Sequence, residues 1–210
     1  MLSTTAGWGR QIPESAEYLE DLKTGMNLTT IQTAHTLDLA VLLGGRLEEL
    51  SAMTSIRYRD VHVTGTDRTI QRVVPDHVVV AAHLAESVPL VVEMRGGVGG
   101  ADAPFRMEIV GAEGRLELVG GSARGFQAGD IDLWHDGELV EVERPFGTLP
   151  VSARNVAGVY SGLVEDLRYG TTQTASLDQA VALSNLIDDV WSAARSGSVV
   201  KDHGRWPVGG

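Results

Sequence analysis

The sequence predicts an α+β fold in which a large, open and mainly antiparallel sheet of about six strands is covered on one face by N- and C-terminal helices. Helical periodicity occurs at both ends of the chain, whereas strand-like alternation of apolar and polar residues fills the middle, from Leu47 to Arg144. Alternating strand–helix units, which are typical of a parallel dinucleotide-binding sheet, do not occur. We therefore expect one α+β domain over residues 1–201, followed by a disordered tail at 202–210.

Four segments carry apolar residues at helical spacing, and a glycine follows each of them. Pro13 suits the first turn of a helix, because proline lacks the N–H that this turn leaves unpaired. The run Ser176-Leu177-Asp178-Gln179 is a capping box, in which the serine and glutamine side chains satisfy each other's backbone N–H groups. The predicted helices are Pro13–Thr24, Thr33–Leu43, a helix around Val156–Leu167, and one from Leu177 to Ala194.

Residues of the middle segment alternate with the period of strands. Phe105, Met107 and Ile109 alternate with charged residues, so this run has one apolar face and one polar, solvent-exposed face. Asp136-Gly137 is a strong hairpin signal, and a change of apolar parity near Asp60 indicates a bulge or a strand break. The predicted strands are Ser51–Val63, Asp76–Ala85, Leu90–Arg95, two runs within 105–118, Ile131–His135 and Glu138–Glu143.

Composition excludes several classes of function. The 28 acidic and 17 basic residues leave a net charge of −11, which disfavours nucleic-acid binding because a phosphate-tracking surface needs clustered lysine and arginine. The chain has no cysteine, so disulfides, thiolate metal sites and a cysteine nucleophile are excluded. It has no apolar run of membrane-spanning length and no basic, apolar leader at its start. We expect a cytoplasmic protein that binds neither membranes nor nucleic acid.

Two groups of residues that could carry chemistry do not match a known motif. The run Arg95–Gly100 follows a strand and is rich in glycine, but the third glycine of a dinucleotide fingerprint would fall on Asp102, and no helix follows. We therefore expect a strand connection there and no cofactor-binding residue. The six histidines show no metal-ligand spacing, so no metal site is expected.

His35 is the histidine most suited to chemistry, because it lies near the start of a predicted helix with Asp38 three residues on. A carboxylate on the same helix face can orient an imidazole and change its proton affinity. The alternative is a buried, hydrogen-bonded histidine with a structural role.

Several blocks of sequence, in order along the chain, resemble the C-terminal half of the Gfo/Idh/MocA oxidoreductases. The similarity is greatest to the branch that contains the yeast galactose-pathway repressor, and it extends from about Tyr18 to Lys201. The blocks are Gly25–Asp38, Leu42–Gly44, Pro75–Val80, Arg154–Tyr160, and Leu177–Val181 with Leu186–Asp188.

This resemblance implies an N-terminal Rossmann domain for NAD(P), followed by a domain whose open sheet forms a substrate pocket and a dimer interface. The present sequence matches the second domain, so we expect a homodimer that binds no NAD(P) alone and that acts with a Rossmann partner in cis or in trans. His35 falls on the catalytic histidine of the family. The carboxylate that often lies four positions earlier is Ile31 here, a departure shared with the repressor-like branch.

The resemblance also directs attention to polar residues that could line a pocket beside His35. Tyr18 and Asn27 precede it, Gln32 lies at the start of its helix, and Arg154-Asn155 begins a later helix, where free N–H groups could meet a polar ligand. We predict these five residues as substrate-binding. For Asn155, the alternative is simple helix capping.

The leading hypothesis is the substrate-binding and dimerisation domain of an NAD(P)-dependent oxidoreductase for a sugar- or polyol-like substrate. Two alternatives remain: a non-catalytic ligand-binding or regulatory protein, which Ile31 favours, and a cofactor-independent lyase, cyclase or isomerase with His35 as general base.

Overall fold

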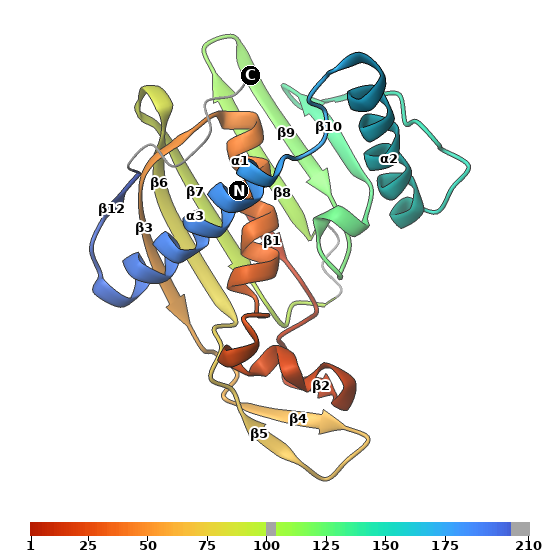
Figure 1. The fold of residues 1–210 in the computed structure, drawn as a ribbon. Helices are drawn as coiled ribbons and strands as arrows, with labels where there is room; N and C mark the ends of the chain where they lie inside the picture. Colours follow the sequence, from red (N-terminus) through yellow and green to blue (C-terminus); the bar gives the residue numbers. More distant parts are fainter. Residues whose placement is uncertain (100–103, 203–210) are drawn as a thin grey trace.

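The computed structural model describes residues 1–99 and 104–202, and it confirms an α+β fold with a large, open, mostly antiparallel sheet (Figure 1). This sheet has nine strands rather than about six, in the order β11-β10-β9-β8-β1-β7-β6-β3-β12. The strands are β1 (Leu2–Thr4), β3 (Leu47–Ser55), β6 (His77–Leu84), β7 (Val88–Arg95), β8 (Phe105–Gly111), β9 (Gly114–Gly120), β10 (Ile131–His135), β11 (Glu138–Val140) and β12 (Val200–Lys201).

A second, three-stranded sheet lies below the main one in Figure 1 and consists of β2 (Gln11–Pro13), β4 (Asp60–Thr64) and β5 (Thr69–Gln71). The strand break expected near Asp60 is confirmed, because β3 ends at Ser55 and β4 joins this separate sheet. The strands that the sequence analysis missed, β1, β2, β5 and β12, have only two or three residues each. Such short strands show no periodicity.

The helical segments are η1 (Glu14–Glu20), η2 (Leu22–Thr24), η3 (Thr29–Thr33), α1 (Ala34–Gly44), η4 (Ala85–Ser87), η5 (Phe126–Ala128), α2 (Val151–Tyr169) and α3 (Leu177–Ser196). The prediction of one helix over Pro13–Thr24 was wrong, because Asp21 has extended backbone angles and separates two 3₁₀ segments. The capping box at Ser176 is confirmed. So is the Asp136-Gly137 hairpin, since both residues have the positive φ that a type I′ turn requires.

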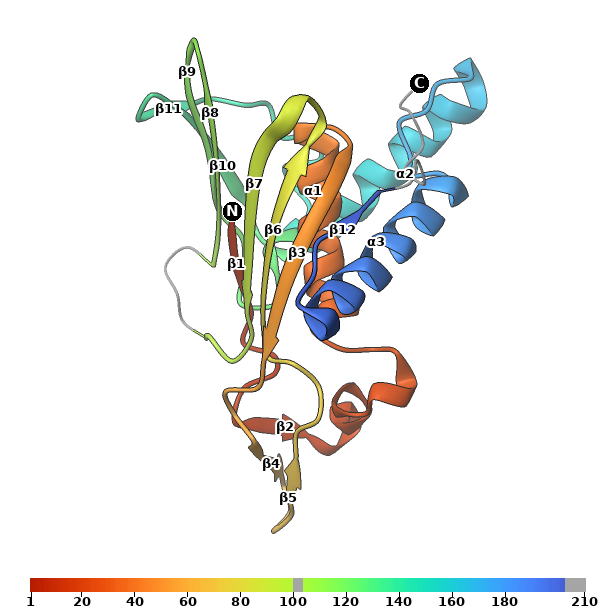
Figure 2. The ribbon, with the colours of Figure 1, turned by 90° about the vertical axis from the view of Figure 1, so that its left-hand side faces the viewer.

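The main core lies between one face of the sheet and the two helices α1 and α3, as Figure 2 shows from the side. Alternate residues of β6, among them Val78 and Val80, point into this core and meet Leu37 of α1 and Val190 of α3. Among the described residues, no helix lies on the other face of the sheet (Figure 2). One-sided coverage by N- and C-terminal helices is therefore confirmed.

Helix α2 differs from α1 and α3 because it stands away from the sheet (Figure 2) and buries only Gly162. Its apolar side chains are largely exposed, for example Leu167 at 79%. Within the described part of the chain, no helix has both the length and the apolar character needed to cross a membrane. Apart from Asp202, the tail expected at 202–210 lies outside the described residues.

Candidate functional site

The N-terminal end of α1 carries a polar cluster whose central residue is Gln32. This side chain belongs to the π-helical turn η3 and is 6% exposed. Its Nε2 donates to the carbonyl of Arg124 at 3.2 Å, which fixes the direction of its Oε1. A Cβ placed on Gly125 would lie 2.6 Å from Oε1 of Gln32 and 2.6 Å from Oε1 of Gln127, so both amides converge on this glycine. A side chain at position 125 would displace them.

The first turns of α2 complete the cluster. Asn155 Nδ2 donates to the carbonyl of Gln127 at 2.6 Å. Arg154 Nη2 lies 2.9 Å from Asp130 Oδ1, and Arg144 reaches the same carboxylate at 2.7 Å. The helix begins at Val151, three residues earlier than expected, and its N-cap makes no side-chain hydrogen bond. Asn155 therefore ties α2 to η5 and does not cap the helix.

Three buried polar atoms of the cluster have no hydrogen-bond partner: Gln32 Oε1, Gln127 Oε1 and Arg154 Nε. An unpaired buried polar atom costs about 1–3 kcal/mol, so native proteins normally pair such atoms with protein, water or ligand. Two acceptors and one donor of these side chains are thus left without a hydrogen bond in the structure.

His35 lies three residues after Gln32, at the second position of α1, and is exposed. Its nearest charged neighbour on the helix is Asp38: loss of hydration raises the pKa of that carboxyl, and the charge of His35 acts in the opposite direction. Ile31 is partly buried against the main core, so the position four residues before His35 contributes to packing.

The two other residues predicted to bind substrate, Asn27 and Tyr18, make their hydrogen bonds outside the polar cluster. Asn27 is 2% exposed, and its Oδ1 accepts from the N–H groups of Thr29 and Thr30, so it caps the turn that precedes α1. Tyr18 lies on η1 with 47% of its surface exposed, and its carbonyl accepts from the hydroxyl of Thr24. The described contacts join Gln32, Arg154 and Asn155 into one cluster, and they do not join Tyr18 to it.

Gln127 and Asp130 were not predicted from the sequence. They lie in a glycine-rich connection between β9 and β10, in which Gly121 and Gly125 have positive φ, as does Gly120 at the end of β9. The high density of glycine in this ten-residue connection is the sequence signal that could have indicated Gln127 and Asp130. Glycines are typical of places where the backbone comes close to another segment or to a ligand.

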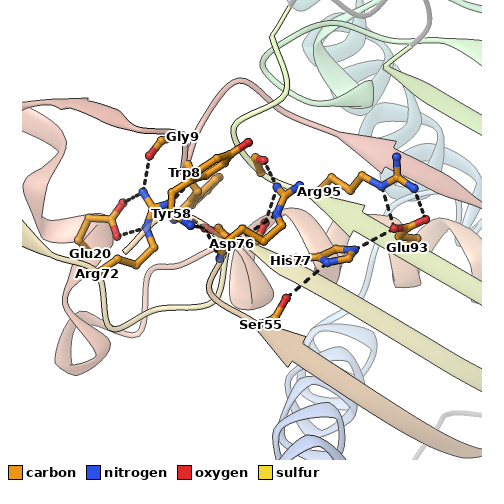
Figure 3. Close-up of polar contacts among 12 residues, drawn as sticks. Trp8, Gly9, Glu20, Ser55, Tyr58, Arg72, Asp76, His77, Glu93 and Arg95 are labelled. Atoms are coloured by element: carbon orange, nitrogen blue, oxygen red, sulfur yellow. Dashed lines mark hydrogen bonds and ion pairs between the residues drawn. The ribbon is translucent and has the colours of Figure 1, made fainter. Parts of the chain in front are cut away.

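A second polar group, shown in Figure 3, lies where the small sheet joins the large one. The side chain of Arg72 is fully buried and uses all five of its N–H groups. Two bonds go to the carboxylate of Glu20, one to Asp76, and one each to the carbonyls of Trp8 and Gly9. Burial disfavours the charge on Asp76, but hydrogen bonds from the backbone of Arg57 and Tyr58 and from Arg72 hold its pKa below the usual value. This network is a structural joint between η1, the turn after β1, and the segment after β5.

The glycine-rich run after β7 does not offer a site for a dinucleotide. The N–H groups of Gly96, Gly97 and Val98 donate to the carbonyls of Asp76, Gly7 and Thr5, so they are not free to hold a pyrophosphate. A Cβ on Gly96 would lie 2.9 Å from the Cβ of Trp8, so close packing explains this glycine. The part of the run from Gly100 onward lies outside the described residues. The paired N–H groups of Gly96–Val98 therefore do not fit a pyrophosphate, and we assign no step of hydride transfer to this run.

No metal site is evident either. Over residues 1–99 and 104–202, no three histidine, aspartate or glutamate side chains are grouped so that they could hold an ion.

Comparison with solved structures finds the same fold within longer chains. A super-repressor mutant of Gal80p from Saccharomyces cerevisiae matches with a TM-score of 0.79 and 22% identity over 95% of this chain and 56% of the other. The transcriptional regulator Gal80p from Kluyveromyces lactis matches with a TM-score of 0.77 and 22% identity, over 95% of this chain and 53% of the other. Levoglucosan dehydrogenase, in complex with NADH and levoglucosan, matches with a TM-score of 0.75 and 14% identity over 96% of this chain and 57% of the other.

The chain thus spans a little over half of each matched structure. No curated protein matches it significantly. The family model of the Gal80p C-terminal domain matches residues 1–120, which is more than half of the 210 residues. The chain therefore belongs to the family of Gal80p-like C-terminal domains.

Proposed function

We propose that this chain is the substrate-binding and dimerisation domain of an oxidoreductase of the Gfo/Idh/MocA type, with a sugar- or polyol-like substrate. The observation that carries the proposal is a set of three buried polar atoms without hydrogen-bond partners, on Gln32, Gln127 and Arg154, of which Gln32 lies three residues before His35. Buried polar atoms without partners, next to an exposed imidazole, suit a small ligand with several hydroxyl groups.

In this proposal Gln32, Gln127, Arg154 and Asn155 bind and orient the ligand, and His35 exchanges a proton with one of its hydroxyl groups. Asp38 lies three residues from His35 on α1, and the charge of His35 acts to lower the pKa of its carboxyl, against the larger effect of desolvation. NAD(P) would belong to a separate Rossmann half, in cis or in trans, since the N–H groups of the glycine-rich run after β7 are already used by backbone carbonyls. Levoglucosan dehydrogenase, which has the same fold over this domain, was solved with NADH and a sugar derivative.

The open face of the sheet is the proposed dimer interface. It carries exposed apolar side chains, Met53 at 68% and Val91 at 56%, between ion pairs that are already formed within the chain. Charges that are paired within one subunit lose less on association than free charges would, and a two-fold axis brings the same patch of both copies together. Val91→Arg should therefore give a monomer in analytical ultracentrifugation.

Val159→Arg on α2 is the matched control, because Val159 is similarly exposed, at 63%, but lies on the helix side. It should leave the dimer intact. If Val159→Arg dissociates the dimer and Val91→Arg does not, the sheet face is not the interface.

Native mass spectrometry with and without NADH tests the assembly and the cofactor together. We expect a dimer whose mass does not change when NADH is added at micromolar concentration. Retention of one NADH per chain would contradict the proposal that NAD(P) binds to a separate Rossmann half.

A second candidate function is a ligand-binding regulator without catalysis. The observation that favours it is Ile31, which packs against the core at the position where the family resemblance implies a carboxylate. The match to Gal80p, a transcriptional regulator, points in the same direction. When a cofactor half is supplied, the oxidoreductase proposal requires turnover that His35→Ala abolishes. A regulator shows ligand binding and no turnover even with His35 present.

A further inference from the structure

We infer that the junction between the two sheets holds a second binding site, for a small aromatic carboxylate, separate from the polar cluster. The site is a cavity of about 490 Å³ at the lower end of the large sheet in Figure 1, where the connections on either side of the small sheet meet η2 and α3. Pockets that bind small organic ligands typically measure roughly 300–1,000 Å³. Five apolar side chains and one cation are among the lining residues: Leu22, Ile56, Val73, Pro75, Trp191 and Arg59.

The apolar wall of this cavity is accessible to a ligand. Leu22 is 49% exposed and Val73 is 54% exposed, although Val74, the next residue, is fully buried in the core. Trp191 packs against the main core with part of its surface and lines the cavity with another part, so the core holds its ring in place. An aromatic ligand body that covers these side chains removes apolar surface from water and stacks on an indole, and both effects favour binding.

Arg59 supplies the cavity with a charge that is free to bind. Among the described residues, its side chain makes no hydrogen bond and no ion pair. The charged side chains next to it in the sequence are occupied elsewhere: Arg57 pairs with Asp76, and Asp60 accepts a hydrogen bond from Gln71. A ligand carboxylate can accept two parallel N–H bonds from such a guanidinium.

The backbone on both sides of Arg59 is fixed by buried groups. The N–H groups of Arg57 and Tyr58 each lie 2.9 Å from an oxygen of the Asp76 carboxylate. The carbonyl of Arg59 accepts from the N–H of Arg72 at 2.8 Å. The side chains of Arg72 and Asp76 are fully buried. Because the backbone is already held, ligand binding orders only the Arg59 side chain, which lowers the entropic cost of association.

The sign of the charge selects the class of ligand. The chain has a net charge of −11, yet the charged side chain among the described lining residues is an arginine, and no acid lines the cavity with it. An amine would meet a like charge there, and an uncharged ring would leave the guanidinium without a partner. A carboxylate attached to an aromatic body satisfies both the cation and the apolar wall.

The test compares 2-naphthylacetate with 2-naphthylacetamide, which has the same rings and no charge. The wild-type protein is labelled with ¹⁵N, and the indole N–H signal of Trp191 and the backbone signals of residues 54–59 are followed during titration with each compound. We expect both compounds to shift these signals, and the carboxylate to bind at least about tenfold more tightly than the amide.

Three variants identify the source of this preference. Arg59→Gln should weaken binding of 2-naphthylacetate about tenfold and leave binding of the amide unchanged. Val73→Glu, which places a like charge beside the ligand, should weaken the carboxylate more than the amide. The matched control is Arg168→Gln, because Arg168 is an exposed arginine on α2, outside the cavity lining, and its replacement should change neither affinity.

Several results would overturn the inference. Equal affinities of the two compounds would do so, as would a preference for the carboxylate that survives Arg59→Gln. The inference also fails if no signal at the cavity shifts, or if the shifts are confined to the side-chain amides of Gln32 and Gln127, which would place the ligand in the polar cluster. If Arg59→Gln does not fold, the comparison of the two compounds on the wild type still decides. The dimer and NADH measurements test the proposed function, which does not depend on this cavity.

Discussion

Replacing Arg72 by methionine removes a fully buried cation and the five hydrogen bonds that it donates. Methionine fills a similar volume, so the cost is mainly electrostatic. The carboxylate of Glu20, whose side chain is 2% exposed, loses both of its hydrogen bonds from Arg72, and the carbonyls of Trp8 and Gly9 lose a donor. Asp76 keeps its bonds from the backbone of Arg57 and Tyr58, so most of the cost falls on Glu20.

Breaking a buried ion pair on one side costs about 3–5 kcal/mol, because a charge is left without a partner in a poorly solvated place. We expect Arg72→Met to lower the free energy of unfolding by about that amount, and the melting temperature by about 10 °C. Urea unfolding followed by circular dichroism measures the free energy directly. The matched control is Arg68→Met, which removes an arginine that is 50% exposed and paired with Glu14 and Glu17.

The control should cost less than about 1 kcal/mol, as exposed ion pairs usually do. Equal losses for Arg72→Met and Arg68→Met would refute the reasoning, because they would mean that Glu20 finds water or another partner when Arg72 is absent.

Two further predictions concern a glycine and a carboxylate. Gly97→Ala should destabilise the protein by about 1–3 kcal/mol more than the control Gly25→Ala. Both glycines have a φ of +69°, so the backbone strain of the two substitutions is similar. At Gly97, however, the new Cβ would lie 2.6 Å from the ring of Tyr58, whereas at Gly25 it would meet no atom within 4 Å. Thermal unfolding of both variants checks this difference, and equal melting temperatures would disprove it. Hydrogen bonds from Arg95 lower the pKa of Glu93 from 4.5 to about 2, so its contribution to stability is complete above pH 4.5 and is lost as the pH falls toward 2. Urea unfolding of the wild type and of Glu93→Gln, measured between pH 2 and 6, tests this. The free energies of unfolding should differ by about 1–2 kcal/mol near pH 6, and the difference should disappear near pH 2. A difference that does not depend on pH would contradict this role of Glu93.

Most of the fold could be predicted because its long elements have strong periods. In β6, Val78, Val80 and Ala82 point toward the core, and this alternation is visible in the sequence. The start of α3 is indicated by the capping box at Ser176. The short strands are different: β1 has three residues and lies between β7 and β8 only because distant backbone groups pair with it. Nothing local specifies such a strand, so sequence patterns cannot find it.

The candidate site was predictable in part for a similar reason. Gln32, Arg154 and Asn155 lie on helices whose starts the sequence indicates within a few residues. Gln127 lies in a glycine-rich connection, and its place beside Gln32 depends on how that connection folds back over α1. The network of Arg72 and Glu20 joins residues 52 positions apart, so no spacing rule could have indicated it.

Helix α2 makes its polar contacts near its two ends. Its first turns are held by Arg154 and Asn155, and its last turn by Asp166, which accepts hydrogen bonds from Thr171 and Thr174 in the loop that follows. Between these anchors the helix has little contact with the sheet. The long apolar side of α2 is therefore open to solvent between polar contacts at its first turns and a polar loop after its last turn.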